Sequence, residues 1–293
     1  MEIRPIRLDE LECFARIERQ AFVMSQDETE QYTQSRYRTH PENTRVLVEQ
    51  GEIVSQLYIL PNHLWLGADT VKVVGIDDVA TPPQYRRYGY LKTLLTQVLE
   101  ELHTQQGYAI SVLHPFSFPF YRNFGYELFC TKKQVRVNIK ALSGFRDSTL
   151  IKGCWLPITP SEWATLDAVY LEFCRGRFGR LTRTDEWWQQ AIANSLKSND
   201  RAAFMWQDVF GRSRAYISYA IRLGENGERE MVIRERVWLD QPAYHALLSF
   251  IASHDAQVSR VIWHTEESED IFGLLSDPAK LKNTFCLIIC YVF

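Results

Sequence analysis

The sequence predicts an α/β (α+β) protein built from two mixed-sheet domains. Its 293 residues exceed the ~150 residues of one typical domain about twofold. Segments with the two-residue period of strands alternate with segments of helical period, and the second half weakly repeats the element order of the first. A hydrophobic fraction of 46% and a charged fraction of 24% exclude disorder and collagen-like repeats. The glycine-bearing polar gap at 143–148 is interpreted as the domain boundary, with expected domains 1–143 and 149–293.

The first half is interpreted element by element from its hydrophobic spacing. The expected elements, in order, are a helix over 8–22, a hairpin of strands 45–49 and 53–60, a strand over 71–79, a helix over 91–102, a strand over 108–113, a short helix over 118–123 and a strand over 134–139. The helix over 91–102 has the clearest pattern, because its apolar residues recur at intervals of three and four. The polar stretch 25–43 is expected to be mainly solvated loop.

The second half gives a similar series with weaker signals. Helices are expected over 161–173, 186–196 and 242–254, a hairpin over 202–207 and 215–223, and strands over 231–239 and 258–264. The apolar run Cys286–Phe293 is expected to be a strand or the scar of a truncation. Trp187 and Trp188 are expected mainly in the core, with a role in lining a cleft between domains as the alternative.

Charge and cysteine content narrow the class of protein. The formal net charge of −3 argues against a general electrostatic grip on nucleic acid or on an anionic membrane. No apolar run approaches the roughly 18–20 residues that span a bilayer, and the N-terminus has no apolar signal segment. Six scattered cysteines without a CxxC pair indicate reduced thiols and no metal site. We therefore expect a cytoplasmic protein with neither a nucleic-acid nor a membrane partner.

One segment has the features of an anion site. A strand ends near Ala80, two prolines stop further strand pairing, and a loop with Arg86, Arg87 and Gly89 leads into the amphipathic helix. Unpaired N–H groups at a helix N-terminus attract phosphate, a glycine permits close approach, and an arginine adds a charge-assisted bond. On spacing alone, a surface turn with solvated arginines explains the segment equally well.

Two motifs together resemble the GNAT acyl-CoA N-acyltransferases. The first is Arg86-Arg87-Tyr88-Gly89-Tyr90-Leu91, similar to the family's pyrophosphate-binding segment, with Leu91 in place of its last small residue. The second is the aromatic turn Phe120-Tyr121-Arg122-Asn123-Phe124-Gly125-Tyr126. The resemblance implies two tandem GNAT-like domains that use acetyl-CoA. It is strong over 70–130 and weak after 150.

Within this superfamily the sequence resembles the enhanced intracellular survival (Eis) acetyltransferases more specifically. The likeness lies in Leu113-His114 ahead of Tyr121, in the phosphate-loop variant, and in the segment 183–188 of the second half. The second domain is expected to be degenerate and not to bind coenzyme A, because no Arg-x-x-Gly precedes its last helix. The family's third, sterol-carrier-like domain is expected to be missing, and whether Phe293 is the native end stays open. A catalytic role for the Phe293 carboxylate is expected to be a minor alternative.

The resemblance assigns roles residue by residue. The residues that would bind the cofactor are Val79, Ala80, Thr81, Arg86, Arg87, Tyr88, Gly89, Tyr90, Leu91, Phe116 and Ser117. Tyr121 is the candidate general acid that reprotonates the thiolate of coenzyme A, since a phenol near pKa 10 and a thiol near 8.5 are close enough for transfer. Tyr126 is expected in the core.

Deprotonation of the acceptor amine requires a base, and two further catalytic candidates are Asp78 and His114. Asp77 and Asp78 are expected on alternate faces of their strand, with one of them toward the substrate. A carboxylate bonded within a strand bulge is an equal alternative, and for His114 a core position is the alternative to a relay. Asp27, Glu28 and Glu30 could line an acidic substrate mouth or simply lie in a solvated loop.

The expected reaction moves an acetyl group from acetyl-CoA to a primary amine by direct attack, without a metal. The acceptor is expected to be a small-molecule or lysine amine, including aminoglycoside and polyamine-like compounds, and a homo-oligomer is one expected assembly. The rival functions are a non-catalytic acyl-CoA-binding or regulatory protein, and a different two-domain enzyme such as a nucleotidyl-type transferase.

Overall fold

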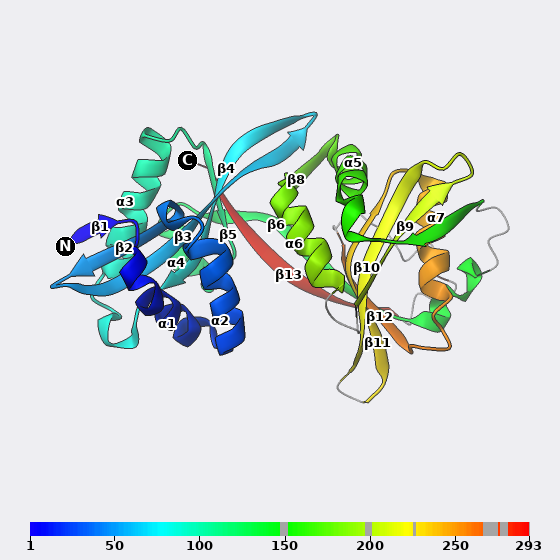
Figure 1. Cartoon of the computed structure of the whole chain (residues 1–293), viewed down its shortest axis with the longest axis horizontal. Coiled ribbons are helices and arrows are strands. Elements are labelled where there is room, and N and C mark those ends of the chain that lie inside the picture. Colours follow the sequence, from blue (N-terminus) through cyan, green and yellow to red (C-terminus); the bar gives the residue numbers. More distant parts are fainter. Residues whose placement is uncertain (147–151, 197–200, 225–226, 266–274, 276–280, 293) are drawn as a thin grey trace. The chain divides into compact units, whose positions relative to one another are not determined.

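The computed structural model describes residues 1–146, 152–196, 201–224, 227–265, 275 and 281–292. The chain separates into two compact units (Figure 1). The boundary between them lies within strand β6 (Glu127–Asn138), after Cys130. Residues Trp65–Thr70, at the tip of a long hairpin, group with the second unit. The expected domain limits at 143 and 149 stay a prediction.

The first unit is a mixed sheet flanked by helices. Its strands and helices are β1 (Glu2–Arg4), α1 (Leu11–Phe22), α2 (Gln26–Tyr32), β2 (Thr44–Glu49), β3 (Glu52–Gly67), β4 (Asp69–Ala80), α3 (Tyr90–Thr104), β5 (Ile110–Leu113) and α4 (Phe118–Arg122). The strand order is β1-β2-β3-β4-β5, and the last strand of the chain, β13 (Leu281–Val292), pairs with β5. Strands β4 and β5 run parallel because α3 connects them, whereas β1, β2 and β3 pair antiparallel.

The sheet of this unit is packed on both faces, because successive strand residues point to opposite sides. On β2, Leu47 belongs to the core formed with helix α3, whereas Val46 belongs to the core formed with α1. The apolar stripe of α3, predicted from its spacing, is buried at Leu94, Leu95, Val98, Leu99 and Leu102. Helix α1 buries Phe14 and Ile17 on the other side.

The second unit repeats this plan. Its elements are β6 (Glu127–Asn138), β7 (Gly153–Pro157), α5 (Trp163–Cys174), β8 (Arg177–Leu181), α6 (Asp185–Leu196), β9 (Arg201–Asp208), β10 (Ser213–Leu223), β11 (Arg229–Trp238), α7 (Gln241–Ala252) and β12 (Arg260–Thr265). The strand order is β6-β12-β11-β10-β9-β7. Here too a helix, α7, connects two parallel strands, β11 and β12. Helices α7 and α5 contribute to two separate cores on this sheet.

Most predicted elements are confirmed, with three corrections. The polar stretch 25–43 is mainly helical, comprising α2, a π-helical turn (Thr33–Tyr37) and a short 3₁₀ turn. Strands β3 and β4 are longer than expected and meet in a tight hairpin, where Gly67 has a φ of 73°. The short strands β1, β7 and β8 were not predicted, because three to five residues are too few to show a period. The C-terminal run is a strand up to Val292, and Phe293 lies outside the described residues.

Candidate active site

Strands β4 and β5 pair over only a short stretch and then diverge. Their parallel register joins Val73 to Ile110 and ends with Gly75 opposite Val112, whereas β4 continues to Ala80. Beyond Gly75 the main chain of β4 is therefore no longer paired with β5. A wedge between two parallel strands offers backbone groups to an extended ligand.

The predicted anion loop lies between β4 and α3. Gly89 is the N-cap residue of α3, with a φ of 84° that places it in the left-handed region. Because Gly89 has no side chain that could cap the helix, the N–H groups of the first helical turn can bind water or a ligand. A Cβ added at Gly89 would meet nothing within 4 Å, so the space beside it is open. Arg87 also has a positive φ, 68°, and its side chain is exposed. The loop therefore combines uncapped N–H groups, open space and an exposed arginine, and its role as a phosphate site stays a prediction.

Of the other loop residues, two are exposed and two pack against the core of the first unit. Arg86 and Tyr88 are exposed, and the Nε atom of Arg86 donates to the Thr81 carbonyl at 3.2 Å, which ties the loop to the end of β4. Tyr90 packs against the core of the first unit, and its hydroxyl donates a hydrogen bond to Glu49. Leu91 also packs against this core, so the departure from the family's small residue is accommodated by packing.

The residues expected along the cofactor arm lie at the two sides of the wedge. At the end of β4, Val79 is half-buried and Ala80 is buried, and Thr81, which follows the strand, is half-buried. The Ala80 carbonyl accepts a hydrogen bond from the Ser55 hydroxyl at 3.3 Å. After β5, Phe116 is 67% exposed, whereas the Ser117 hydroxyl caps α4 by accepting from the Phe120 N–H.

Tyr121 occupies a buried position at the end of α4. Its side chain is 2% exposed and its ring packs edge-on against Phe116, Phe120 and Tyr126 at 5.2–5.7 Å between centroids. Burial, together with the negative charge of Asp77, raises its pKa above the ordinary value of a phenol. Tyr121 is therefore fully protonated at neutral pH, as a general acid must be. Proton transfer from it to a thiolate is, however, less favourable than the ordinary values indicate.

The other two candidates of this region have different environments. Tyr126 is a core residue, as predicted, since it is fully buried and its hydroxyl lies 2.7 Å from the Ser111 hydroxyl. His114 is exposed immediately after β5. The alternative of a core histidine is therefore wrong, because the chain leaves the sheet at Leu113. A relay role for His114 stays a prediction.

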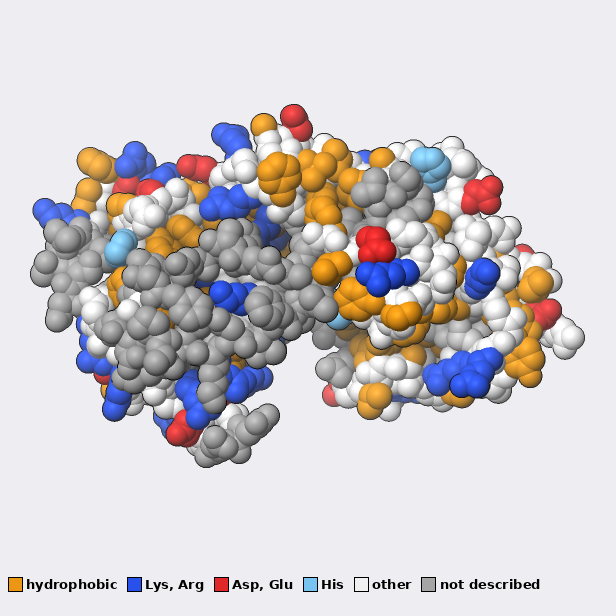
Figure 2. All heavy atoms as spheres, turned by 180° about the vertical axis from the view of Figure 1, so that it is seen from behind, with side chains coloured by type: hydrophobic (Ala, Val, Ile, Leu, Met, Phe, Trp, Pro, Cys, Tyr) orange, Lys and Arg blue, Asp and Glu red, His pale blue; other side chains and the backbone are white. Residues whose placement is uncertain are grey.

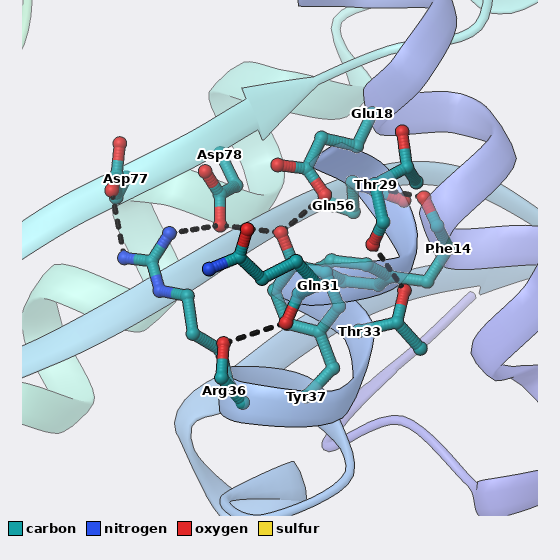
Figure 3. A network of polar contacts seen from close by, with 11 residues as sticks. Phe14, Glu18, Thr29, Gln31, Thr33, Arg36, Tyr37, Gln56, Asp77 and Asp78 are labelled. Carbon is teal, nitrogen blue, oxygen red and sulfur yellow. Dashed lines mark hydrogen bonds and ion pairs between the residues drawn. The ribbon is translucent and has the colours of Figure 1, made fainter. Parts of the chain in front are cut away.

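The two aspartates of β4 do not alternate as expected. Asp77 Oδ2 and Asp78 Oδ2 lie 2.9 and 3.2 Å from the same guanidinium, that of Arg36 (Figure 3). Asp78 has a φ of 51°, outside the extended region, and this local change breaks the two-residue period of the strand. The expectation of opposite faces is therefore wrong. Asp77 is half exposed, whereas Asp78 is buried.

Asp78 belongs to a buried network that also contains Tyr37 and Glu18 (Figure 3). The Tyr37 hydroxyl lies 2.8 Å from Asp78 Oδ2 and also contacts Glu18 Oε2. A phenol has a single proton to donate, so the second carboxyl must itself be protonated to complete the network. Glu18 and Asp78 are therefore joined through a single phenol, so the protonation of one carboxyl affects that of the other.

Burial explains why this pair titrates near neutral pH. Burial, reinforced by the charge of Asp77 and opposed by that of Arg36, raises the pKa of Asp78 to about 6. Burial and then the charge of Asp78 raise the pKa of Glu18 to about 7. A carboxyl pair with these values can accept a proton and release it again near pH 7.

Glu18, Arg36 and Tyr37 were not identified from the sequence as functional residues. One signal was present for Glu18: it lies four residues after Phe14 on the buried face of α1, where a carboxylate needs a partner. Arg36 and Tyr37 gave no such signal, because they lie in the stretch interpreted as loop. Asp27 and Glu30 are exposed on α2, and their role at a substrate mouth stays a prediction, as does that of Glu28.

The network predicts a pH dependence of stability. Raised carboxyl pKa values mean that the folded state binds protons more tightly than the unfolded state, so stability falls as pH rises from about 4.5 to about 7. Glu18→Gln removes one of these carboxyls. We therefore expect the change in its unfolding free energy between these pH values to be smaller by on the order of 1–3 kcal/mol. Denaturant unfolding of both proteins at pH 4.5 and 7.5 measures it. Glu12→Gln, on the exposed face of the same helix, serves as the control, and an unchanged slope in Glu18→Gln would contradict the network.

The described part of the chain has neither a metal-binding cluster nor a membrane-spanning helix. Within it, no cluster of three or more His, Cys, Asp or Glu side chains could hold a metal ion. None of its helices is long and apolar enough to cross a membrane. On the face shown in Figure 2, Lys and Arg side chains are scattered among acidic and apolar ones. The expected absence of metal and of nucleic-acid partners stays a prediction.

The fold and both halves of the sequence now identify the family. Residues 2–129 and residues 179–289 each match an acetyltransferase (GNAT) domain family. The chain therefore belongs to the GNAT acetyltransferases and contains two GNAT domains in tandem. No curated protein matches the sequence.

Solved structures share the fold over 99% of the chain. A GCN5-related N-acetyltransferase from Anabaena variabilis has a TM-score of 0.87 at 23% identity, and 72% of that chain is covered. A probable N-acyltransferase from Enterococcus faecalis has a TM-score of 0.85 at 21% identity, again with 72% covered. Eis1 from Mycobacterium abscessus has a TM-score of 0.78 at 16% identity, with 73% covered. At these identities the likeness shows the fold alone.

Proposed function

We propose that the first unit transfers an acetyl group from acetyl-CoA to a primary amine. The observation that carries the proposal is the combination, within one unit, of an open glycine loop at the N-terminus of α3 and a proton-handling pair beside diverging strands. The charge of Asp77 raises the pKa of Tyr121, so this aspartate and the phenol influence each other electrostatically. The glycine loop suits a pyrophosphate, and the Glu18–Asp78 pair suits a reaction in which protons are transferred.

Donor binding would use the loop and the wedge. The N–H groups at the start of α3 and the Arg87 guanidinium would hold the pyrophosphate. Main-chain groups of Val79–Thr81 would hydrogen-bond the pantetheine arm, with Phe116 and Ser117 on the other side. When bound, acetyl-CoA supplies a thioester carbonyl that the amine attacks directly.

Proton transfer would involve both sides of the site. A primary amine is protonated at neutral pH and must lose a proton before it attacks. The Glu18–Asp78 pair would accept this proton, directly or through water, with Tyr37 keeping the two carboxyls aligned. Tyr121 would give its proton to the departing thiolate. His114, exposed after β5, remains a candidate relay.

The same charges favour a cationic acceptor. Arg36 offsets part of the charge of Asp77 and Asp78, so the cluster of Glu18, Arg36, Asp77 and Asp78 has at most two negative charges in excess and attracts rather than repels an ammonium group. We infer an acceptor amine of the small-molecule or lysine class, including aminoglycosides and polyamine-like compounds. The second domain would be degenerate, and cytoplasmic location and homo-oligomer formation are parts of the same proposal.

The alternative of a non-catalytic acyl-CoA-binding protein uses the same loop. It differs in leaving the Glu18–Asp78 pair and Tyr121 without a chemical role, so it predicts binding without thiol release. A nucleotidyl-type transferase is disfavoured, because both halves match the acetyltransferase (GNAT) domain family.

The loop is tested by Gly89→Val. At a φ of 84° a branched side chain would fill the open space next to the first-turn N–H groups. We expect acetyl-CoA affinity to fall by roughly ten-fold or more, equivalent to at least about 1.4 kcal/mol. Isothermal titration of acetyl-CoA into the full chain measures the change, and the native chain should bind one equivalent.

Gly51→Val is the matched control for this variant. Gly51 also has a positive φ, 83°, and open space around it, but it lies in the turn between β2 and β3. The Gly51→Val substitution introduces the same backbone strain away from the loop before α3, so acetyl-CoA affinity should be retained. Equal affinity in Gly89→Val and the native chain would contradict the phosphate site.

A further inference from the structure

The second unit contains a cavity that has no role in the acetyl transfer proposed for the first unit. Its volume is about 300 Å³, and its described lining comes from α5, α6, β9, β10, β11 and the segments before α5 and α6. This is at the lower end of the ~300–1,000 Å³ typical of small-molecule sites. The cavity is therefore large enough for a compact ligand.

A bulge in β11 directs charged side chains into this cavity. The register between β10 and β11 pairs Ser218 with Glu235 and then Tyr219 with Ile233, so Arg234 is an extra residue on β11. In a regular strand Arg234 and Glu235 would point to opposite faces, but both line the cavity. Bulges are frequent beside binding sites because they re-aim side chains in this way.

The Glu235 carboxylate is already neutralised by Arg183. Arg183 Nη1 donates to Glu235 Oε2 at 3.0 Å, and Nη2 donates to the other carboxylate oxygen at 2.5 Å. The same guanidinium lies 3.8, 4.0 and 4.7 Å from the ring centroids of Tyr170, Trp187 and Trp188. This bidentate, ring-stacked pair is fixed and has no net charge.

Outside this pair, the described lining has a further exposed basic side chain, Arg234. Among its described lining residues Glu235 is the sole acid, whereas Arg201 and Arg234 are basic in addition to Arg183. Arg234 is exposed at the bulge. The Ser218 side chain lines the same cavity and can donate a further hydrogen bond. An anionic group is therefore favoured at this end.

The walls of the cavity are largely aromatic and apolar. Trp188 is buried in the core, as predicted, and Trp187 packs edge-on against it at 5.2 Å while remaining 43% exposed. Tyr216 adds one further ring, and Ile158 and Leu166 are apolar. Flat rings in such surroundings gain from offset or edge-on packing.

We propose that this cavity binds a small aromatic carboxylate, with its carboxylate on Arg234 and Ser218 and its ring against Trp187. A planar carboxylate matches the two-pronged donor geometry of arginine. The apolar walls favour an aromatic body over inorganic phosphate or a nucleotide. The described lining residues all belong to the second unit, so the proposal does not depend on acetyl transfer.

Isothermal titration of indole-3-acetate into the full chain tests the proposal. We expect one equivalent to bind, and neutral indole-3-acetamide to bind roughly ten-fold or more weakly because it lacks the charge. Arg234→Gln and Trp187→Ala should each weaken indole-3-acetate binding by about ten-fold or more. Arg222→Gln, an exposed arginine of β10 that is not among the described lining residues, should leave it unchanged.

Circular dichroism and thermal unfolding of the same variants report whether the second unit folds, since their substitutions lie in that unit. Absence of indole-3-acetate binding to the native chain would overturn the proposal. Equal affinity for the acid and the amide, or unchanged affinity in a folded Arg234→Gln, would also overturn it. If Arg234→Gln does not fold, Trp187→Ala and the comparison of acid with amide still decide.

Discussion

Replacement of Tyr121 by Phe is expected to lower turnover by roughly 10²–10⁴-fold, the usual contribution of a positioned general acid. The change removes one oxygen and keeps the ring that packs against Phe116, Phe120 and Tyr126. Folding and acetyl-CoA affinity should therefore survive. Because the phenol acts in the transition state, kcat and kcat/KM should fall together. Thiol release with an accepted amine measures both.

Tyr126→Phe is the matched control on the same turn. It removes the hydroxyl bonded to Ser111 at 2.7 Å, so we expect a loss of stability of about 1 kcal/mol and nearly native turnover. If Tyr121→Phe kept native turnover, the acid would have to be another group.

Asp78→Asn is expected to reduce turnover by roughly 10²–10⁴-fold as well, for a different reason. Asparagine cannot accept the proton of the amine, although it can keep hydrogen bonds to Arg36 and Tyr37. In the native chain kcat/KM should rise with pH through the pKa of the pair, which lies between about 6 and about 7. This acidic limb should disappear from the residual activity of the variant. A pH series of thiol release measures it.

Asp77→Asn separates charge from proton transfer. Asp77 binds the same arginine at 2.9 Å but is half exposed. We expect it to weaken acceptor binding, seen as a higher KM, with a much smaller effect on kcat. If Asp77→Asn abolished turnover and Asp78→Asn did not, the proton acceptor would be misassigned.

The elements that position the loop were predictable because they repeat a local pattern. Helix α3 shows its buried stripe in the spacing of Leu94, Leu95 and Val98, and Gly89 marks its start. The aromatic turn around Tyr121 was recognisable from residue types alone. The strands and helices of the second unit also followed from their periods.

The buried network of Glu18, Tyr37 and Asp78 could not be predicted, because it depends on contacts between distant residues. Tyr37 and Asp78 are 41 positions apart, and their contact requires a π-helical turn within a stretch whose composition indicates loop. The positive φ of Asp78 brings two neighbouring carboxylates to one arginine, which no strand period indicates. The bulge at Arg234 escapes prediction for the same reason, since it is a property of pairing with β10.

The most direct test of acetyl transfer is the release of coenzyme A thiol from acetyl-CoA by the native chain across a panel of primary amines. The panel contains aminoglycosides, lysine peptides and polyamines, and product masses identify the acetylated amine. We predict that at least one amine gains one acetyl group for each thiol released. Tight binding of acetyl-CoA with no amine-dependent thiol release across the panel would contradict the proposed function and favour a non-catalytic acyl-CoA-binding protein.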